Sequence, residues 1–294
     1  MPIIARGIVC RGRRDGDPSS SIRSGPLARW GARLYLVTTL RNTVRVAGME
    51  PLKVFILGPA RSGTSITYFC MRRVFHLRGR GESHVMPAFE VMLAAFHDYK
   101  AKKRSTGNIA FRAIDGARLE SHIHDFVRNF YAELYPSGAF VDKTPGAHAI
   151  RGIPLIRAVF PEAKIVITKR GGIETVNSFR KKFSMSIASA SKIWTSCMEA
   201  ILWAQENVEN VHIIEQFDMT NASEAVAANL CAYLGHTEKT AEVVQFFRET
   251  ERQKTSDHDS SKPMTLADVP WSLQEQRVFL RLSGDMMRRM AYPL

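Results

Sequence analysis

Short apolar runs recur along the chain, each of a length suited to one β-strand. Lys53–Leu57 (KVFIL) and Lys164–Thr168 (KIVIT) are continuous and rich in β-branched residues. Such runs are typical of strands that are buried on both faces of a parallel sheet. Shorter runs at Ala139–Val141 and Val211–Ile214 predict two further strands. The apolar pattern therefore predicts a central, mostly parallel sheet.

Segments with apolar residues three or four positions apart separate these runs, as expected for helices that bury one face. The predicted helices are Ser62–Phe75, Ala88–Lys103, Ala117–Tyr135, Ile150–Phe160, Ile173–Phe183, Ala188–Asn207, Ala222–Leu234, Ala241–Glu249 and Leu273–Met290. Residues 252–269 are polar and irregular. Alternating strands and helices predict an α/β fold of three layers, with the sheet flanked by helices. No apolar run reaches the roughly 18 residues that a membrane span needs.

The first fifty residues differ in composition from the rest of the chain. They hold nine arginines, no lysine and three acids, so they supply +6 of the net charge of +13. The stretch Asp15–Pro26 is rich in Ser, Gly, Arg and Pro, which favours disorder. We predict a disordered basic extension over residues 1–50 and one folded domain over residues 51–294. We expect a cytoplasmic location, with organelle targeting as the alternative because transit peptides share this Arg-rich composition.

The charge of residues 51–294 and the positions of the cysteines limit the kinds of ligand that this domain is expected to bind. The excess outside the first fifty residues is +7 over 244 residues, which does not require binding to nucleic acid. A basic balance still favours an anionic ligand. Cys10, Cys70, Cys197 and Cys231 form neither a C-x-x-C pair nor a metal-ligand spacing. We therefore predict no metal site.

The strongest local signal is Gly58–Ser65 (GPARSGTS), which follows a predicted strand and opens a predicted helix. In such a turn, backbone N–H groups surround a phosphate and the helix dipole adds positive potential. The G-x-x-x-x-G spacing matches a P-loop. An NTPase places Lys after the second Gly, and Thr64 stands there instead, which argues against γ-phosphoryl transfer. The residues expected to bind the anion are Arg61, Ser62, Gly63, Thr64 and Ser65.

The run Pro59–Ser65 resembles the Pro-Arg-Ser-Gly-Thr-Thr loop of sulfotransferases that use 3′-phosphoadenosine-5′-phosphosulfate (PAPS), with Ala60 as one extra residue. In that family the loop holds the 5′-phosphosulfate. Arg170 at a strand end and Ser178, eight residues on, match a second family element, although Gly171 replaces its Asp. The resemblance implies that Arg170 and Ser178 bind the 3′-phosphate. One turn later on the predicted helix, Lys182 adds a third contact.

Two further segments resemble tyrosylprotein and related bacterial sulfotransferases. Asp142–Pro145 (DKTP) is similar to their Asp-Lys-Thr-Pro segment, which implies that Lys143 stabilises the bridging oxygen as the S–O bond breaks. Gly81–Pro87 (GESHVMP) is similar to their Gly-Glu-Glu-Thr-Arg-Val-Ile-Pro stretch but is one residue shorter than it. The resemblance implies that Glu82 is the general base. The alternative bases are His84 and His148.

The resemblance covers roughly residues 52–235 and implies a sulfotransferase domain within residues 51–294. It implies in-line transfer of a sulfuryl group from PAPS to a hydroxyl or amine, with Arg61 and Lys143 stabilising charge without a metal ion. The acceptor is open between a small molecule, a carbohydrate and a protein tyrosine, and a homodimer is compatible with the sequence.

Two alternatives come from other features of the sequence. A P-loop kinase or NTPase is supported by Asp142, which ends an apolar strand as a Mg²⁺-binding Asp does. A non-catalytic binder of nucleic acid or anionic lipid is supported by the Arg-rich first fifty residues.

Overall fold

The computed structural model describes residues 50–104, 113, 115–250 and 261–294. Met49–Leu294 forms one compact unit. The predicted disordered extension lies outside the described residues, except for Glu50. Within the described part of the chain, no helix is long and apolar enough to cross a membrane.

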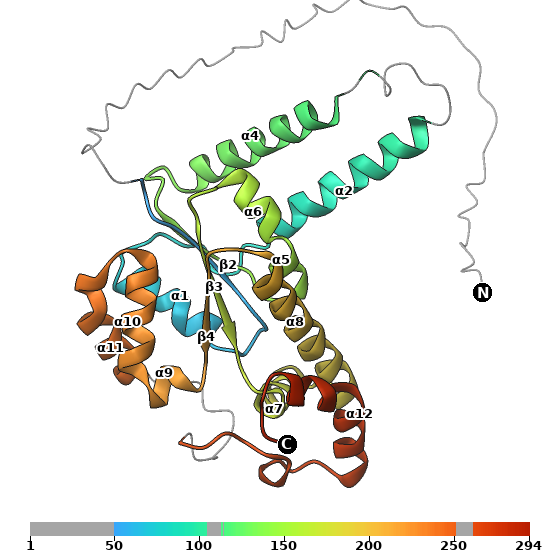
Figure 1. Cartoon of the computed structure of the whole chain (residues 1–294), viewed down its shortest axis with the longest axis vertical. Coiled ribbons are helices and arrows are strands. Elements are labelled where there is room, and N and C mark those ends of the chain that lie inside the picture. The colour runs from blue at the N-terminus through green and yellow to red at the C-terminus, as the bar shows by residue number, and fades with distance from the viewer. Residues whose placement is uncertain (1–49, 105–112, 114, 251–260) are drawn as a thin grey trace, which may run out of the picture. The chain divides into compact units, whose positions relative to one another are not determined.

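A four-stranded parallel sheet forms the centre of this unit, in the order β2-β1-β3-β4. Strand β1 (Lys53–Leu57) pairs with β2 (Phe140–Lys143) on one side and with β3 (Lys164–Lys169) on the other. Strand β4 (Val211–Glu215) forms the edge beside β3. All four predicted strands are confirmed. The α/β class with a parallel central sheet is also confirmed (Figure 1).

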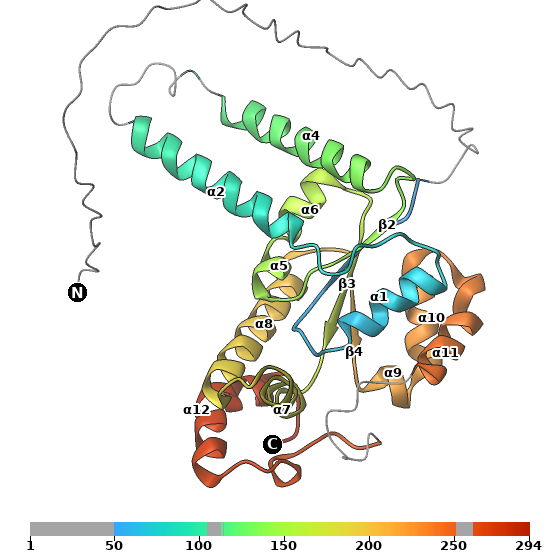
Figure 2. The ribbon, with the colours of Figure 1, turned by 180° about the vertical axis from the view of Figure 1, so that it is seen from behind.

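Helices cover both faces of the sheet because successive side chains of each strand point to opposite sides. Val54 and Ile56 pack with α1 (Thr64–Arg73), α10 (Ser223–Leu234) and α11 (Thr240–Glu249). Phe55 and Leu57 belong to the second core, with α4 (Gly116–Leu134), α6 (Ile153–Val159), α7 (Gly172–Phe183), α8 (Ile187–Asn207) and α12 (Leu273–Arg289). Figure 2 shows these layers from behind.

Helix α2 (Val85–Arg104) lies beside α4 in both views (Figures 1 and 2). The ring of Phe89 on α2 meets the rings of Phe126 and Phe130 on α4 edge-on, at centroid distances of 5.7 and 5.8 Å. Edge-to-face packing of this kind adds to the stability that burial of the rings supplies. The loop before α2 carries Glu82 and His84, and the packing of α2 on α4 holds the end of that loop.

The single helix predicted over Ile150–Phe160 is wrong. The structure has α5 (Ala147–Arg151) and α6 instead, with Gly152 between them and Pro154 in the first turn of α6. Pro lacks a backbone N–H and fixes its own φ, so it begins a helix better than it continues one. Four short elements were also not predicted: α5, α9 (Asp218–Asn221) and the 3₁₀ turns Thr237–Lys239 and Leu266–Asp268.

Candidate functional site

The loop Gly58–Ser65 turns sharply between β1 and α1. Gly58 and Gly63 have φ values of +134° and +96°, and Arg61 has a φ of +70°. Gly63 occupies the N-cap position of α1, and no acidic residue lies in the first turn of this helix. The first N–H groups of a helix have no partner within it, and the helix dipole makes that end positive. The end of α1 is therefore suited to bind an anion.

The Ser62 side chain ties this loop to the end of β3. Its Oγ donates to the carbonyl oxygen of Pro59 at 2.6 Å and lies 2.8 Å from Oγ1 of Thr168. A third contact, at 3.2 Å, reaches the carbonyl oxygen of Thr168. Ser62 is fully buried, so its hydroxyl is directed into the protein. The Ser62 hydroxyl thus stabilises the shape of the loop, and the contact of Ser62 with the anion stays a prediction.

The loop also requires a glycine at position 58. A Cβ there would lie 2.2 Å from the carbonyl oxygen of Thr168. Substitution of Gly81 by Ala is a matched control for the steric clash at position 58. The φ of Gly81 is also positive, at +83°, but an added Cβ meets nothing within 4 Å. We expect Gly81→Ala to lower the free energy of unfolding by about 1 kcal/mol through backbone strain. Gly58→Ala should lower it by at least about 3 kcal/mol because the clash adds to the strain. Denaturant unfolding measures both, and equal losses would contradict the steric argument.

Three predicted anion-binding residues meet at the ends of β1 and β3. Arg61 Nε donates to Ser178 Oγ on α7 at 2.9 Å. Arg170 Nη1 donates to the carbonyl oxygen of Arg61 at 3.3 Å. Both contacts join segments more than 100 residues apart, at separations of 117 and 109 positions. These contacts place the two predicted phosphate-binding groups side by side in one basic site.

A cavity of about 360 Å³ opens beside this basic site. Its lining joins cations, hydroxyl groups and an apolar wall: Arg61, Gly63, Thr64, Ser65, Ile66, Phe69, Arg170, Gln216, Met219 and Thr250. On α7, Lys182 is exposed and Ser178 is fully buried, and neither is among these lining residues. Four predicted residues of the Gly58–Ser65 loop thus line the same cavity as Arg170.

Sequence reasoning missed the lining residues outside the two motifs. Gln216 directly follows β4, and Met219 lies on the short helix α9 just after it. Ligands of parallel sheets bind at the carboxyl ends of the strands, so this position was a readable signal. Phe69 and Ile66 lie on α1 among other apolar residues, and nothing in the sequence distinguishes them from residues of the core.

Lys143 connects the loop to a second group of predicted residues. Its Nζ donates to Glu82 Oε1 at 3.0 Å and to Ser65 Oγ at 3.1 Å. The Lys143 side chain is 8% exposed, whereas Glu82 is 49% exposed. The Lys143 ammonium also lies 5.7 Å from the centroid of the Tyr68 ring, which attracts a cation. The structure thus brings the predicted cation and the predicted base together at the start of α1.

The three candidate bases have different neighbours. Glu82 Oε2 lies 3.7 Å from His84 Nε2, so these two side chains are adjacent. His148 Nε2 lies 3.3 Å from Glu90 Oε2 on α2. Glu82 is the candidate that contacts Lys143 directly. This geometry favours Glu82 and keeps His84 beside it.

A sequence model of the sulfotransferase family matches residues 51–239. This chain belongs to the sulfotransferase family. The match includes every predicted site residue, from Arg61 to Lys182. The family resemblance seen in the motifs is thereby confirmed.

Two solved structures are similar to this sulfotransferase. The sulfotransferase domain of the olefin synthase from Synechococcus PCC 7002 is 18% identical, with a TM-score of 0.49, and the alignment covers 84% of this chain and 98% of that one. Sulfotransferase STF9 from Mycobacterium avium is 12% identical, with a TM-score of 0.48, and the alignment covers 84% and 79%. Comparison with curated proteins gave no match.

Asp142 is the residue on which the kinase alternative depended. It is buried, and its carboxylate accepts hydrogen bonds from Ser83, Tyr131 and Thr144. Burial raises the pKa of Asp142, and these three hydrogen bonds oppose the rise. Both carboxylate oxygens of Asp142 already accept hydrogen bonds from side chains of the protein, which argues against a role of Asp142 in binding Mg²⁺. Among the described residues, no group of three or more His, Cys, Asp or Glu side chains is arranged to hold a metal ion.

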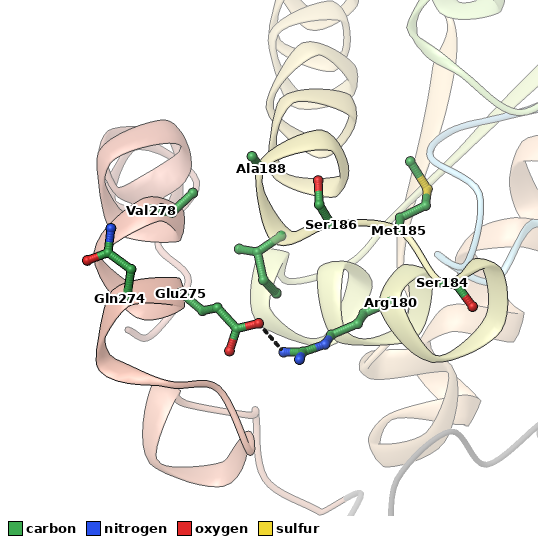
Figure 3. Close-up of a pocket in the computed structure, with 9 residues that line it drawn as sticks. Arg180, Ser184, Met185, Ser186, Ala188, Gln274, Glu275 and Val278 are labelled. Atoms are coloured by element: carbon green, nitrogen blue, oxygen red, sulfur yellow. Dashed lines mark ion pairs between the residues drawn. The ribbon is translucent and has the colours of Figure 1, made fainter.

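A second cavity, of about 440 Å³, lies between α7, α8 and α12. Figure 3 shows Arg180 of α7 pointing to Glu275 of α12, with which it forms an ion pair at 2.8 Å. Ser178, two residues earlier on α7, contacts Arg61 instead. None of the predicted site residues is among those that line this cavity: Arg180, Ser184, Met185, Ser186, Ile187, Ala188, Gln274, Glu275 and Val278.

Proposed function

We propose that this sulfotransferase moves a sulfuryl group from PAPS to a hydroxyl or amine acceptor. The observation that carries the proposal is the Lys143 ammonium, held between Glu82 and the Ser65 hydroxyl at the start of α1. This contact joins a candidate base, a buried cation and an anion-binding loop. Each is needed for transfer of a charged group to a nucleophile that loses a proton.

The donor would bind across the basic site. The 3′- and 5′-phosphates of PAPS are attached to one ribose, so their two binding sites have to be neighbours. The contact between Arg61 and Ser178 is consistent with that requirement. In this proposal the Gly58–Ser65 loop binds the 5′-phosphosulfate, whereas Arg170 and Ser178 bind the 3′-phosphate. Lys182 remains a proposed third contact from its exposed position on α7.

The reaction would be a direct in-line displacement. A lone pair of the acceptor forms the new bond to sulfur, and the bond from sulfur to the bridging oxygen of the donor breaks. Adenosine 3′,5′-bisphosphate leaves with the bonding electrons, and Glu82 takes the proton of the acceptor as that proton becomes acidic. Lys143 stabilises the negative charge on the bridging oxygen, a contribution of about 3–4 kcal/mol for a well-placed donor.

The cations of the protein would replace a metal ion in this reaction. A sulfuryl group carries less negative charge than a terminal phosphoryl group, so Arg61 and Lys143 suffice without Mg²⁺. Adenosine 3′,5′-bisphosphate at about 100 times its Kd should stabilise the protein by about 2.7 kcal/mol. The melting temperature then rises by roughly 5–10 °C for a folded unit of this size. ATP at the same concentration should give a much smaller shift.

The same preparation then tests the transfer itself. Labelled PAPS is incubated with a panel of small-molecule alcohols and amines, carbohydrates and tyrosine peptides, with and without EDTA. Label should move to at least one class, and the rate should not change in EDTA. A larger melting shift with ATP, no transfer of label from PAPS, and transfer of labelled phosphate from ATP that is lost in EDTA would together favour a kinase instead.

A further inference from the structure

The proposed mechanism leaves one buried acid without a role. Asp142 is 2% exposed and directly precedes Lys143 on β2. Its Oδ2 accepts from Ser83 Oγ at 2.6 Å and from Tyr131 Oη at 2.7 Å, and its Oδ1 accepts from Thr144 Oγ1 at 3.1 Å. Burying a carboxylate costs stability unless hydrogen bonds compensate for the lost water. These three hydroxyls provide that compensation. Thr144 belongs to the same segment as Asp142, whereas Ser83 and Tyr131 connect Asp142 to two other segments.

One of those segments carries the candidate base. Ser83 lies between Glu82 and His84, and its backbone N–H donates to the carbonyl oxygen of Lys143 at 3.3 Å. Glu82 and Lys143 form an isolated parallel bridge, so the backbone of this loop meets β2 over a very short length. The Ser83 hydroxyl also accepts from the N–H of Val85 at the start of α2, at 3.3 Å. Ser83 therefore links the loop to β2 and to α2.

The alternation of β2 separates the two neighbouring side chains. Lys143 reaches Ser65 and Tyr68 on α1, whereas Asp142 reaches Tyr131 on α4. Successive side chains of a strand point to opposite faces, which explains this division. The strand β2 thus directs the Lys143 ammonium toward the Gly58–Ser65 loop. On its opposite face, Asp142 binds Ser83 and so holds the segment Gly81–His84, called here the Glu82 loop.

We propose that Asp142 is a positioning residue: through Ser83 it holds the Glu82 loop on β2, so that the Glu82 carboxylate stays within 3.0 Å of the Lys143 ammonium. The inference rests on the proposed function, because it assumes that Glu82 and Lys143 act on the acceptor and the leaving group. A displacement of about 1 Å at a reacting group costs about a hundredfold in rate. A loosened Glu82 loop should therefore slow turnover and leave donor binding unchanged.

Asp142→Asn and Ser83→Ala test the link from its two ends. Asn keeps the size of Asp but replaces one acceptor oxygen by an NH₂ group, and Ala removes the donor hydroxyl. Each variant should lose about tenfold or more in turnover, because the loop is displaced. The Kd for adenosine 3′,5′-bisphosphate should stay within about twofold, because the donor contacts are intact. If the two residues act through their shared hydrogen bond, the double variant should be no slower than the slower single variant.

Tyr131→Phe is the matched control. It removes a hydrogen bond of nearly the same length to the same Oδ2, but the donor comes from α4 and not from the Glu82 loop. We expect this variant to be less stable than the wild type. Its turnover should stay within about threefold of the wild-type value. An equal loss of turnover in Tyr131→Phe and Ser83→Ala would overturn the proposal, because Asp142 would then only support packing. A parallel loss of donor affinity in Asp142→Asn would overturn it as well.

Amide hydrogen exchange gives a readout that does not depend on sulfuryl transfer. In Asp142→Asn and Ser83→Ala, the amides of Gly81–Val85 should exchange faster, whereas those of β1 keep their protection. Unchanged exchange in Gly81–Val85 overturns the positioning role whatever the activity. If the wild-type protein transfers no sulfuryl group to any acceptor, the proposed function fails, and exchange still decides whether Asp142 holds the loop.

Discussion

Lys143→Ala is expected to lower turnover by about a hundredfold or more, while the Kd for adenosine 3′,5′-bisphosphate changes by less than about threefold. In the proposed reaction, negative charge builds on the bridging oxygen as the S–O bond breaks, so a cation placed there stabilises the transition state more than the bound donor. The Lys143 side chain is 8% exposed, and this burial strengthens its electrostatic effect relative to a cation in water. Initial rates with labelled PAPS at saturating donor measure the change.

Loss of folding must be separated from loss of chemistry in this variant. Glu82 is 49% exposed, so removal of its partner leaves a solvated carboxylate and costs little stability. Lys192→Ala is a suitable control, because Lys192 is exposed on α8 and lies outside both motifs. The control should keep the wild-type rate. Near-normal turnover in Lys143→Ala, with an unchanged melting temperature, would show that Lys143 is a bystander.

The two central strands, β1 and β3, could be predicted from the sequence because they are buried on both faces. Val54, Phe55, Ile56 and Leu57 are each at most 1% exposed, so the whole of β1 except Lys53 had to be apolar. A glycine with φ of +134° then marks the turn, because other residues strain there. Local chemistry of this kind is visible in a single sequence. The break at Gly152 has an equally local cause, because Pro154 fixes its own φ and begins α6.

The candidate site could be predicted from the sequence only in part, because its contacts join segments that are distant along the chain. The motifs named Arg61 and Ser178 separately, but nothing in their spacing says that they touch across 117 positions. Asp142 shows the same limit more clearly. The sequence shows an acid at the end of an apolar strand, a position that suits a metal ligand. Thr144 is close to Asp142 in the sequence, but only the fold brings the hydroxyls of Ser83 and Tyr131 to its oxygens.

Arg170→Gln is expected to weaken binding of adenosine 3′,5′-bisphosphate by roughly 10–100-fold, since hydrogen bonds to charged groups are worth about 1.5–3 kcal/mol. Binding of adenosine 5′-phosphate should change by less than about threefold, because that nucleotide has no 3′-phosphate for Arg170 to contact. Isothermal titration calorimetry with both nucleotides measures the difference directly. The comparison between the two ligands removes any general effect of the substitution on the cavity, which Arg170 also lines.

Two further arginines make this comparison sharper. Arg61→Gln should weaken both nucleotides, because Arg61 belongs to the loop proposed to bind the 5′-phosphate and also contacts Ser178 at the proposed 3′-phosphate site. Arg180→Gln should weaken neither, because Arg180 points away to Glu275 on α12 (Figure 3). Equal losses for both nucleotides in Arg170→Gln would mean that Arg170 does not distinguish the 3′-phosphate. The donor would then have to bind in another orientation, with Arg61 and Arg170 acting on the same phosphate.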